Sequence, residues 1–121
     1  MRKAILFGLL TAALATPATA ATYPVSGRWG QSTGTTKGAI DCTGKRVVAF
    51  DGDQRTDSGG GVPTYRNQSV TPAGSAQYRI VDVFSTGQIS DAKASYTLRL
   101  IDDDHIELRM QNGTLKLQRC K

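Results

Sequence analysis

The chain has 121 residues, of which 15 are Lys or Arg and 10 are Asp or Glu, and its formal net charge is +5. A chain of this length forms one domain with a modest core. Its basic residues are scattered and are not interleaved with aromatic residues. Composition and charge therefore argue against a nucleic-acid-binding protein.

The first twenty residues contain the three parts of a cleavable export signal. Met1-Arg2-Lys3 is a short positive segment, residues 4–15 are mostly apolar, and Ala18-Thr19-Ala20 fits the small-residue rule for cleavage. The apolar stretch is too short to span a bilayer, and no Cys follows the cleavage site, so we expect no permanent membrane anchor. Cleavage would leave residues 21–121 as a single domain in the periplasm or outside the cell, with a net charge of +3 once Arg2 and Lys3 are removed.

Two cysteines, Cys42 and Cys120, remain after cleavage. An even number of cysteines in an exported chain predicts one intramolecular disulfide. Such a bridge would close a long loop, and the chain-entropy description gives it up to about 4.5 kcal/mol of stability. Two free thiols or an intermolecular bridge are the alternatives.

The first half of the domain has two expected strands and one long polar segment. The strands lie at residues 23–31, around Val25 and Trp29, and at residues 45–50. Residues 51–76 are polar and rich in turn residues, including three consecutive glycines, and are expected to form a loop with at most one short strand near residues 65–70. A loop this long inside a compact domain is either functional or mobile.

The second half alternates between apolar and polar residues, as half-buried strands do. Strands are expected at residues 77–84, 94–101, 105–111 and 114–120. The turn at Asp102-Asp103-Asp104 predicts that Leu100 lies opposite Ile106.

The next turn is expected at Asn112-Gly113, because this dipeptide favours the type I′ hairpin. It predicts that Met110 pairs with Leu115 and that Leu108 pairs with Leu117. Residues that face the core would then meet residues that face the core, as a one-sided sheet requires.

These elements predict an all-β fold, a small antiparallel barrel of six to eight strands with one disulfide. Arg99, Glu107 and Lys116 are expected to be exposed. The expected core consists of Trp29, Phe50, Ile80, Tyr96, Leu98, Leu100, Ile106, Leu108, Met110, Leu115 and Leu117.

Residues with recognisable catalytic or metal-binding spacing are lacking. His105 is the only histidine and is expected to lie on the surface, whereas a metal site needs three or four ligands. No G-x-S-x-G motif occurs, and the spacing of Asp51, Asp53 and Asp57 does not fit a calcium-binding EF-hand loop. We therefore expect no metal, no cofactor and no enzymatic activity.

Gly27-Arg28-Trp29 on the first strand, with Arg119 on the last, resembles the G-x-W signature of lipocalin-like (calycin) barrels. The resemblance implies a small barrel in which Trp29 closes one end and Arg119 packs across it. A guanidinium over an indole is favourable by about 0.5 to 2 kcal/mol. An ordinary core tryptophan is the other interpretation of Trp29.

The size, the export signal and the G-x-W start also resemble small periplasmic inhibitors of bacterial metalloproteases. Those inhibitors insert an N-terminal tail into the protease cleft, and residues 21–24 would be that tail here. The chain departs from them in its cysteines, because their disulfide is local whereas Cys42 and Cys120 would join an early strand to the last one.

The candidate binding residues are Arg55, Tyr65 and Arg66, in the segment 51–76. Loops on a rigid barrel often carry binding, and Tyr and Arg are enriched at binding hot spots; a disordered insertion is the alternative. We expect a monomeric, exported, non-catalytic binding protein, either an inhibitor of an unknown protein target or a binder of a small apolar ligand. A structural or stress-related cell-envelope protein without a ligand site is the alternative.

Overall fold

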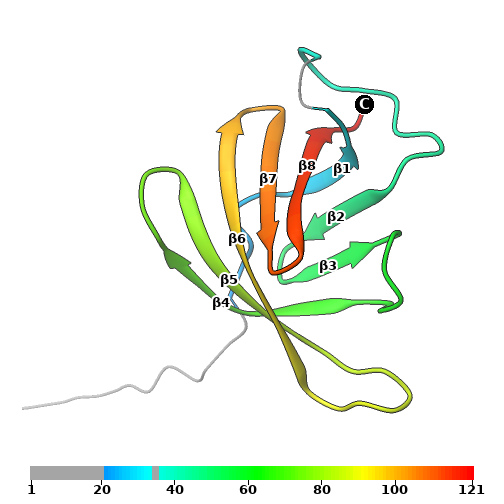
Figure 1. Ribbon diagram of the computed structural model, residues 1–121, viewed down its shortest axis with the longest axis vertical. Coiled ribbons are helices and arrows are strands. Elements are labelled where there is room, and N and C mark those ends of the chain that lie inside the picture. Colours follow the sequence, from blue (N-terminus) through cyan, green and yellow to red (C-terminus); the bar gives the residue numbers. More distant parts are fainter. Residues whose placement is uncertain (1–20, 34–35) are drawn as a thin grey trace, which may run out of the picture.

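The computed structural model describes residues 21–33 and 36–121, so the expected export signal lies outside the described residues. Eight strands follow one another along the chain (Figure 1): β1 (Gly27–Gln31), β2 (Val47–Asp51), β3 (Gln54–Asp57), β4 (Tyr65–Pro72), β5 (Gln77–Phe84), β6 (Ala92–Asp102), β7 (His105–Met110) and β8 (Gly113–Arg119). Each strand pairs antiparallel with the next, and β8 pairs with β1, which closes the barrel. The predicted fold class is confirmed. Within the described residues, no helix is long and apolar enough to cross a membrane.

The barrel interior holds the predicted core with two exceptions. Leu100 and Met110 are only partly buried, because both lie near the ends of their strands. Arg99 and Lys116 are exposed as expected, while Glu107 is half-buried beside Arg99. The buried apolar side chains are Tyr23, Trp29, Val48, Phe50, Ile80, Tyr96, Leu98, Ile106, Leu108, Leu115 and Leu117.

One of the two predicted registers is correct and the other is wrong by two residues. Leu100 lies opposite Ile106, as the aspartate turn predicts. In the β7–β8 hairpin, however, Leu108 pairs with Leu115, because the turn consists of residues 111–112 and Gly113 already belongs to β8. Gly113 has a φ of 144°, which favours glycine. A shift of two residues keeps every side chain on its predicted face, since side chains alternate along a strand.

The prediction of a long loop at residues 51–76 is wrong, although the short strand expected near residues 65–70 is present as part of β4. This segment contains all of β3 and β4, and only residues 58–64 connect these strands. In β3 the inward-facing residues are Arg55 and Asp57, which are both buried. The alternation in β3 is therefore between charged and polar residues, and an apolar pattern does not mark it as a strand.

The predicted disulfide joins the β1–β2 connection to the end of β8. Cys42 and Cys120 are bonded, with their Cα atoms 5.6 Å apart. Gly30 allows this packing, because a Cβ at that position would lie 2.5 Å from the sulfur of Cys42. Next to the bridge, the guanidinium carbon of Arg119 lies 4.4 Å from the ring centre of Trp29.

Candidate functional site

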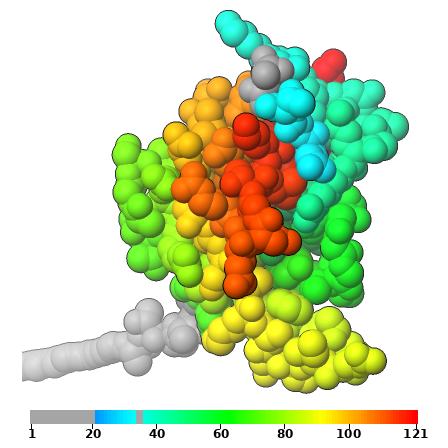
Figure 2. All heavy atoms as spheres, viewed as in Figure 1, coloured from blue at the N-terminus to red at the C-terminus, as the bar shows by residue number. Residues whose placement is uncertain are grey.

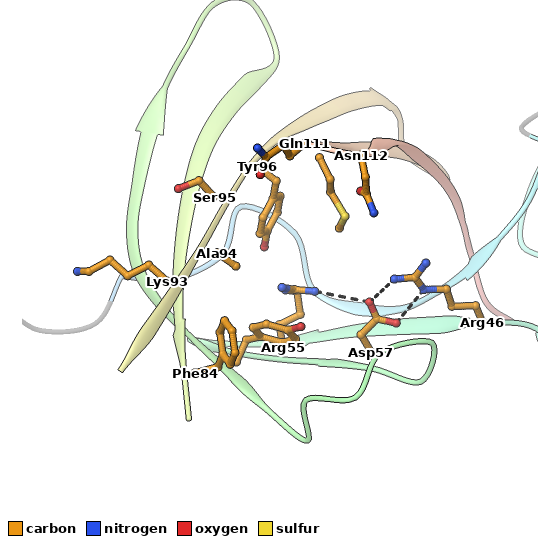
Figure 3. Close-up of a pocket in the computed structure, with 13 residues that line it drawn as sticks. Arg46, Arg55, Asp57, Phe84, Lys93, Ala94, Ser95, Tyr96, Gln111 and Asn112 are labelled. Carbon is orange, nitrogen blue, oxygen red and sulfur yellow. Dashed lines mark hydrogen bonds and ion pairs between the residues drawn. The ribbon is translucent and has the colours of Figure 1, made fainter. Parts of the chain in front are cut away.

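Four charged side chains of alternating sign, Asp82, Arg55, Asp57 and Arg46, run from the barrel interior to its mouth. Figure 3 shows the outer three, Arg55, Asp57 and Arg46. Arg55 Nε donates a 2.9 Å hydrogen bond to Asp82, and Arg55 Nη1 lies 3.9 Å from Asp57 Oδ2. Arg46 donates two hydrogen bonds to Asp57, at 2.9 and 2.7 Å. Each charge in this row is therefore next to a charge of the opposite sign.

The inner pair of this row is almost completely removed from solvent. The side chains of Arg55 and Asp82 are 3% and 0% exposed. Asp82 accepts two further hydrogen bonds, from Tyr96 Oη at 2.9 Å and from Asn67 Nδ2 at 3.1 Å. A buried charge needs such partners, because an unpaired one is strongly destabilising.

Two buried tyrosines lie beside the Asp82 carboxylate. Burial, together with the nearby Asp82, raises the pKa of Tyr23 and of Tyr96 far above the usual range, so both hydroxyls stay protonated. The Tyr23 ring packs edge-on against Phe50, with 5.0 Å between the ring centres. Its hydroxyl makes no hydrogen bond of good geometry to a described residue.

The guanidinium group of Arg55 is also held by aromatic rings. Its central carbon lies 3.8 Å from the ring centre of Tyr65 and 5.0 Å from that of Tyr96. Tyr65 in turn packs edge-on against Phe84, with the ring centres 5.2 Å apart. Burial alone would lower the pKa of Arg55, but the Asp82 carboxylate, by its charge and its hydrogen bond, raises it above its ordinary value, so the side chain is a permanent cation.

The outer pair, Arg46 and Asp57, depends on a glycine. Burial would raise the pKa of Asp57, but the hydrogen bonds from Arg46 and from the Gly59 amide lower it below its usual value. A Cβ at Gly59 would clash with the Arg46 side chain at Nε. The absence of a side chain at Gly59 thus gives Arg46 room to reach Asp57.

A cavity of about 500 Å³ opens above these charges at the mouth of the barrel. Figure 3 shows Tyr96, Arg55 and Asp57 around the cavity and Lys93 directed away from it; the Lys93 amine donates to Gln68. The cavity is lined by Arg46, Arg55, Asp57, Gly60, Tyr65, Phe84, Lys93, Ala94, Ser95, Tyr96, Met110, Gln111 and Asn112. Its wall is therefore partly aromatic, and its rim carries amide and hydroxyl groups.

The three binding residues predicted from sequence have different positions. Arg55 and Tyr65 come together at the cavity, but as strand residues and not as loop residues. Arg66 follows Tyr65 on β4 and is exposed on the outer surface.

Sequence reasoning missed four residues of the site: Arg46, Asp57, Asp82 and Tyr96 as a hydrogen-bond donor. One signal was present for Asp82. It lies two residues after Ile80, so an alternating strand points both side chains inward, and a carboxylate at an inward position of a largely apolar strand is unusual. A second signal was the pair of opposite charges at Arg55 and Asp57, which an alternating strand places on one face.

His105 lies outside this site. Its Nδ1 is 2.7 Å from Asp102 Oδ1 and its Nε2 is 2.8 Å from the Thr36 carbonyl oxygen. Both neighbours are acceptors, so the doubly protonated ring satisfies both contacts. The hydrogen bond with Asp102, followed by the one with Thr36, raises the pKa of His105 above 6.5.

Among the residues that the structure describes, no group of three or more His, Cys, Asp or Glu side chains could hold a metal ion. The candidate site is thus a polar and aromatic pocket built from strand residues. Comparison with known proteins finds no matching protein family, curated protein or solved structure.

Proposed function

We propose that this chain is an exported, non-catalytic protein that binds a small ligand in the cavity at the barrel mouth. The observation that carries the proposal is Arg55, which is held by Asp82 and two tyrosines at the floor of a cavity of about 500 Å³. This volume is typical of small-molecule sites. The export signal predicted at residues 1–20 and the disulfide both favour an oxidising compartment, the periplasm or the exterior.

The burial of Arg55 and Asp82 supports a binding role. A buried ion pair often contributes no more to stability than apolar side chains of the same volume would. In a barrel this small, apolar side chains could fill the same space without a desolvation cost. The presence of the pair is explained if the guanidinium is needed at the floor of the cavity, in a fixed orientation.

The lining favours an amphipathic ligand. The charges of Arg46, Asp57, Arg55 and Asp82 balance, so this row does not select strongly for an ion of either sign. The aromatic wall suits an apolar or aromatic body, and the arginines and rim amides suit a polar group on that body.

Inhibition of an enzyme is a second candidate, favoured by the β5–β6 hairpin. This hairpin, yellow in Figure 2, stands out from the rest of the barrel, and Ile89 near its tip is 52% exposed. A tail-insertion mechanism is less suited to this chain, because Tyr23 is buried in the barrel. Ile89→Asp should then abolish inhibition of a panel of secreted proteases without changing ligand binding.

The proposed function is tested with a fluorescent probe, 8-anilinonaphthalene-1-sulfonate, which has an aromatic body and a polar group. The folded protein should bind this probe saturably, and Ala94→Trp should weaken binding at least about tenfold by filling the cavity. Thr97→Trp places the same side chain on the outer surface of the same strand and should bind like the unmodified protein. Equal binding by Ala94→Trp and the unmodified protein would refute the proposal, as would the absence of saturable binding.

A further inference from the structure

Four basic side chains lie on the outer surface of β5–β8, in two neighbouring rows across the strands. One row contains Arg79 and Arg109, which alternate with Thr97 and Thr114. The next row contains Arg99 and Lys116, with Glu107 between them. We call Arg79, Arg99, Arg109 and Lys116 the cationic face; all four are exposed.

Most of these charges have no acidic partner. Arg99 lies 3.6 Å from Glu107. Within the described part of the chain, Arg79, Arg109 and Lys116 form no ion pair. Neighbouring strands lie about 4.8 Å apart, so basic groups on alternate strands of a row are about 10 Å apart. The face therefore presents several separated positive charges to an external partner.

The cationic face has a local charge of +3. Residues 21–121 have a net charge of +3, with 13 basic and 10 acidic residues. The face contains four of the basic residues and only Glu107 of the acidic ones, so nine of each kind lie elsewhere. β6, β7 and β8, coloured from yellow to red, lie together on the surface that Figure 2 presents, so the basic residues of these three strands lie close together. The acidic residues Asp102, Asp103 and Asp104 lie at the β6–β7 turn, beyond the two rows.

The outward-facing residues of these strands indicate what kind of anion would fit. Those on β5–β8, all of which the structure describes, include no Phe, Tyr or Trp, and the His105 ring is held by Asp102 and Thr36 and is only 11% exposed, so the face has no stacking platform for nucleic-acid bases. Ile101 continues the outer side of β6 two residues beyond Arg99 and is 44% exposed. Separated cations, threonine hydroxyls and an exposed aliphatic side chain suit a layer of phosphate headgroups above hydrocarbon.

We infer that the cationic face binds the surface of a membrane containing anionic phospholipids, as a reversible electrostatic contact. This contact is separate from the barrel-mouth cavity, because none of the four residues lines that cavity. The protein would hold its ligand while resting on the membrane through β5–β8.

Sedimentation with lipid vesicles tests the inference. The protein should bind vesicles of mixed phosphatidylglycerol and phosphatidylcholine, and should not bind phosphatidylcholine alone. Binding should be lost at roughly 1 M salt, where the screening length falls to about 3 Å. Each basic residue near an anionic surface contributes about fivefold in affinity, so Arg79→Gln with Arg109→Gln and Lys116→Gln should weaken binding roughly 100-fold.

A matched control carries the same change in net charge elsewhere: Arg28→Gln with Lys37→Gln and Lys45→Gln. The unmodified protein, the variant of the cationic face and the control variant are prepared with the same N-terminus, which mass spectrometry checks. Thermal unfolding should give all three the same midpoint, so that differences in binding do not reflect unfolding. The control should lose much less affinity than the triple variant of the cationic face. Equal losses in both variants would overturn the inference, as would no binding to anionic vesicles or tighter binding to a DNA oligonucleotide than to vesicles. None of these results depends on ligand binding in the cavity.

Discussion

At each end of the barrel an arginine lies over an aromatic ring, but the two arginines differ in exposure and in partners. The Arg119 side chain over Trp29 is 41% exposed, and its acidic neighbour Asp104 is 3.6 Å away. It donates to the Asp103 carbonyl oxygen, which ties the end of β8 to the β6–β7 turn. Arg55 is 3% exposed and pairs with the fully buried Asp82.

The difference shows that the same type of side chain has different roles in solvent and in the barrel interior. Solvent screens Arg119, so its contacts contribute packing and modest electrostatic energy. Arg55 lies where solvent is excluded, so its orientation is determined by Asp82, Tyr65 and Tyr96. We therefore expect the Arg119 end to tolerate the loss of Asp104, and the Arg55 end not to tolerate the loss of Asp82.

The largest expected effect is the loss of Asp82. Asp82→Ala leaves Arg55 buried without its main partner and should lower the free energy of unfolding by about 3 to 5 kcal/mol. Asp104→Ala, the matched change beside Arg119, should cost less than about 1 kcal/mol. Urea unfolding of both variants measures the contrast, and similar losses would show that the two ends are not distinguished by burial.

A double variant separates stability from binding at the same end. Arg55→Met with Asp82→Leu leaves no charge of the inner pair, so it should recover most of the stability that Asp82→Ala loses. It should still fail to bind the fluorescent probe, because the floor of the cavity has lost its guanidinium. Retained probe binding would mean that Arg55 has only a structural role.

A somewhat smaller effect is expected at the Trp29 end from removing the disulfide. Cys42→Ala with Cys120→Ala should lower the free energy of unfolding by about 2 to 5 kcal/mol, since the bridge spans 78 positions. Probe binding at the folded barrel mouth should change little, because the bridge lies at the other end of β8. A large loss of probe affinity in the folded variant would show that the two ends are coupled.

The smallest expected effect is the pH dependence of the contact between His105 and Asp102. The pKa of His105 is raised, so its contribution to stability is complete below about pH 6.5 and is lost as the pH rises through the folded pKa. The pKa of Asp102 is lowered, so its contribution persists above about pH 4. The stability difference between the unmodified protein and His105→Gln should therefore be greater at pH 5.5 than at pH 8.5, and a difference that grows with pH would contradict this assignment.

The strands of the second half could be predicted because their alternation is between apolar and polar residues. The aspartate turn also gave the correct pairing of Leu100 with Ile106. The turn expected at Asn112-Gly113 did not give the correct pairing of β7 with β8. A turn at Asn112-Gly113 and the observed turn at Gln111-Asn112 keep the same residues inward, so the apolar pattern fits both. Only backbone pairing distinguishes registers that differ by two residues.

The candidate site could be predicted only in part. Arg55 and Tyr65 are identifiable from their residue types, but Asp82 lies 27 positions from Arg55 and meets it only inside the closed barrel. The four residues of the cationic face likewise belong to four different strands. In the sequence they are far apart and cannot be distinguished from scattered surface charges. Only the strand pairing shows that they are neighbours.

The sequence by itself determined the all-β class, the disulfide and the inward face of the later strands, because these depend on alternation and on residue chemistry within short segments. The tertiary structure alone decided that β3 is a strand, that Arg55 is paired with Asp82, and that four basic side chains from four strands form one face. The physical reason is that burial and charge pairing depend on distances across the barrel. Barrel closure determines those distances, and no local pattern in the chain contains them.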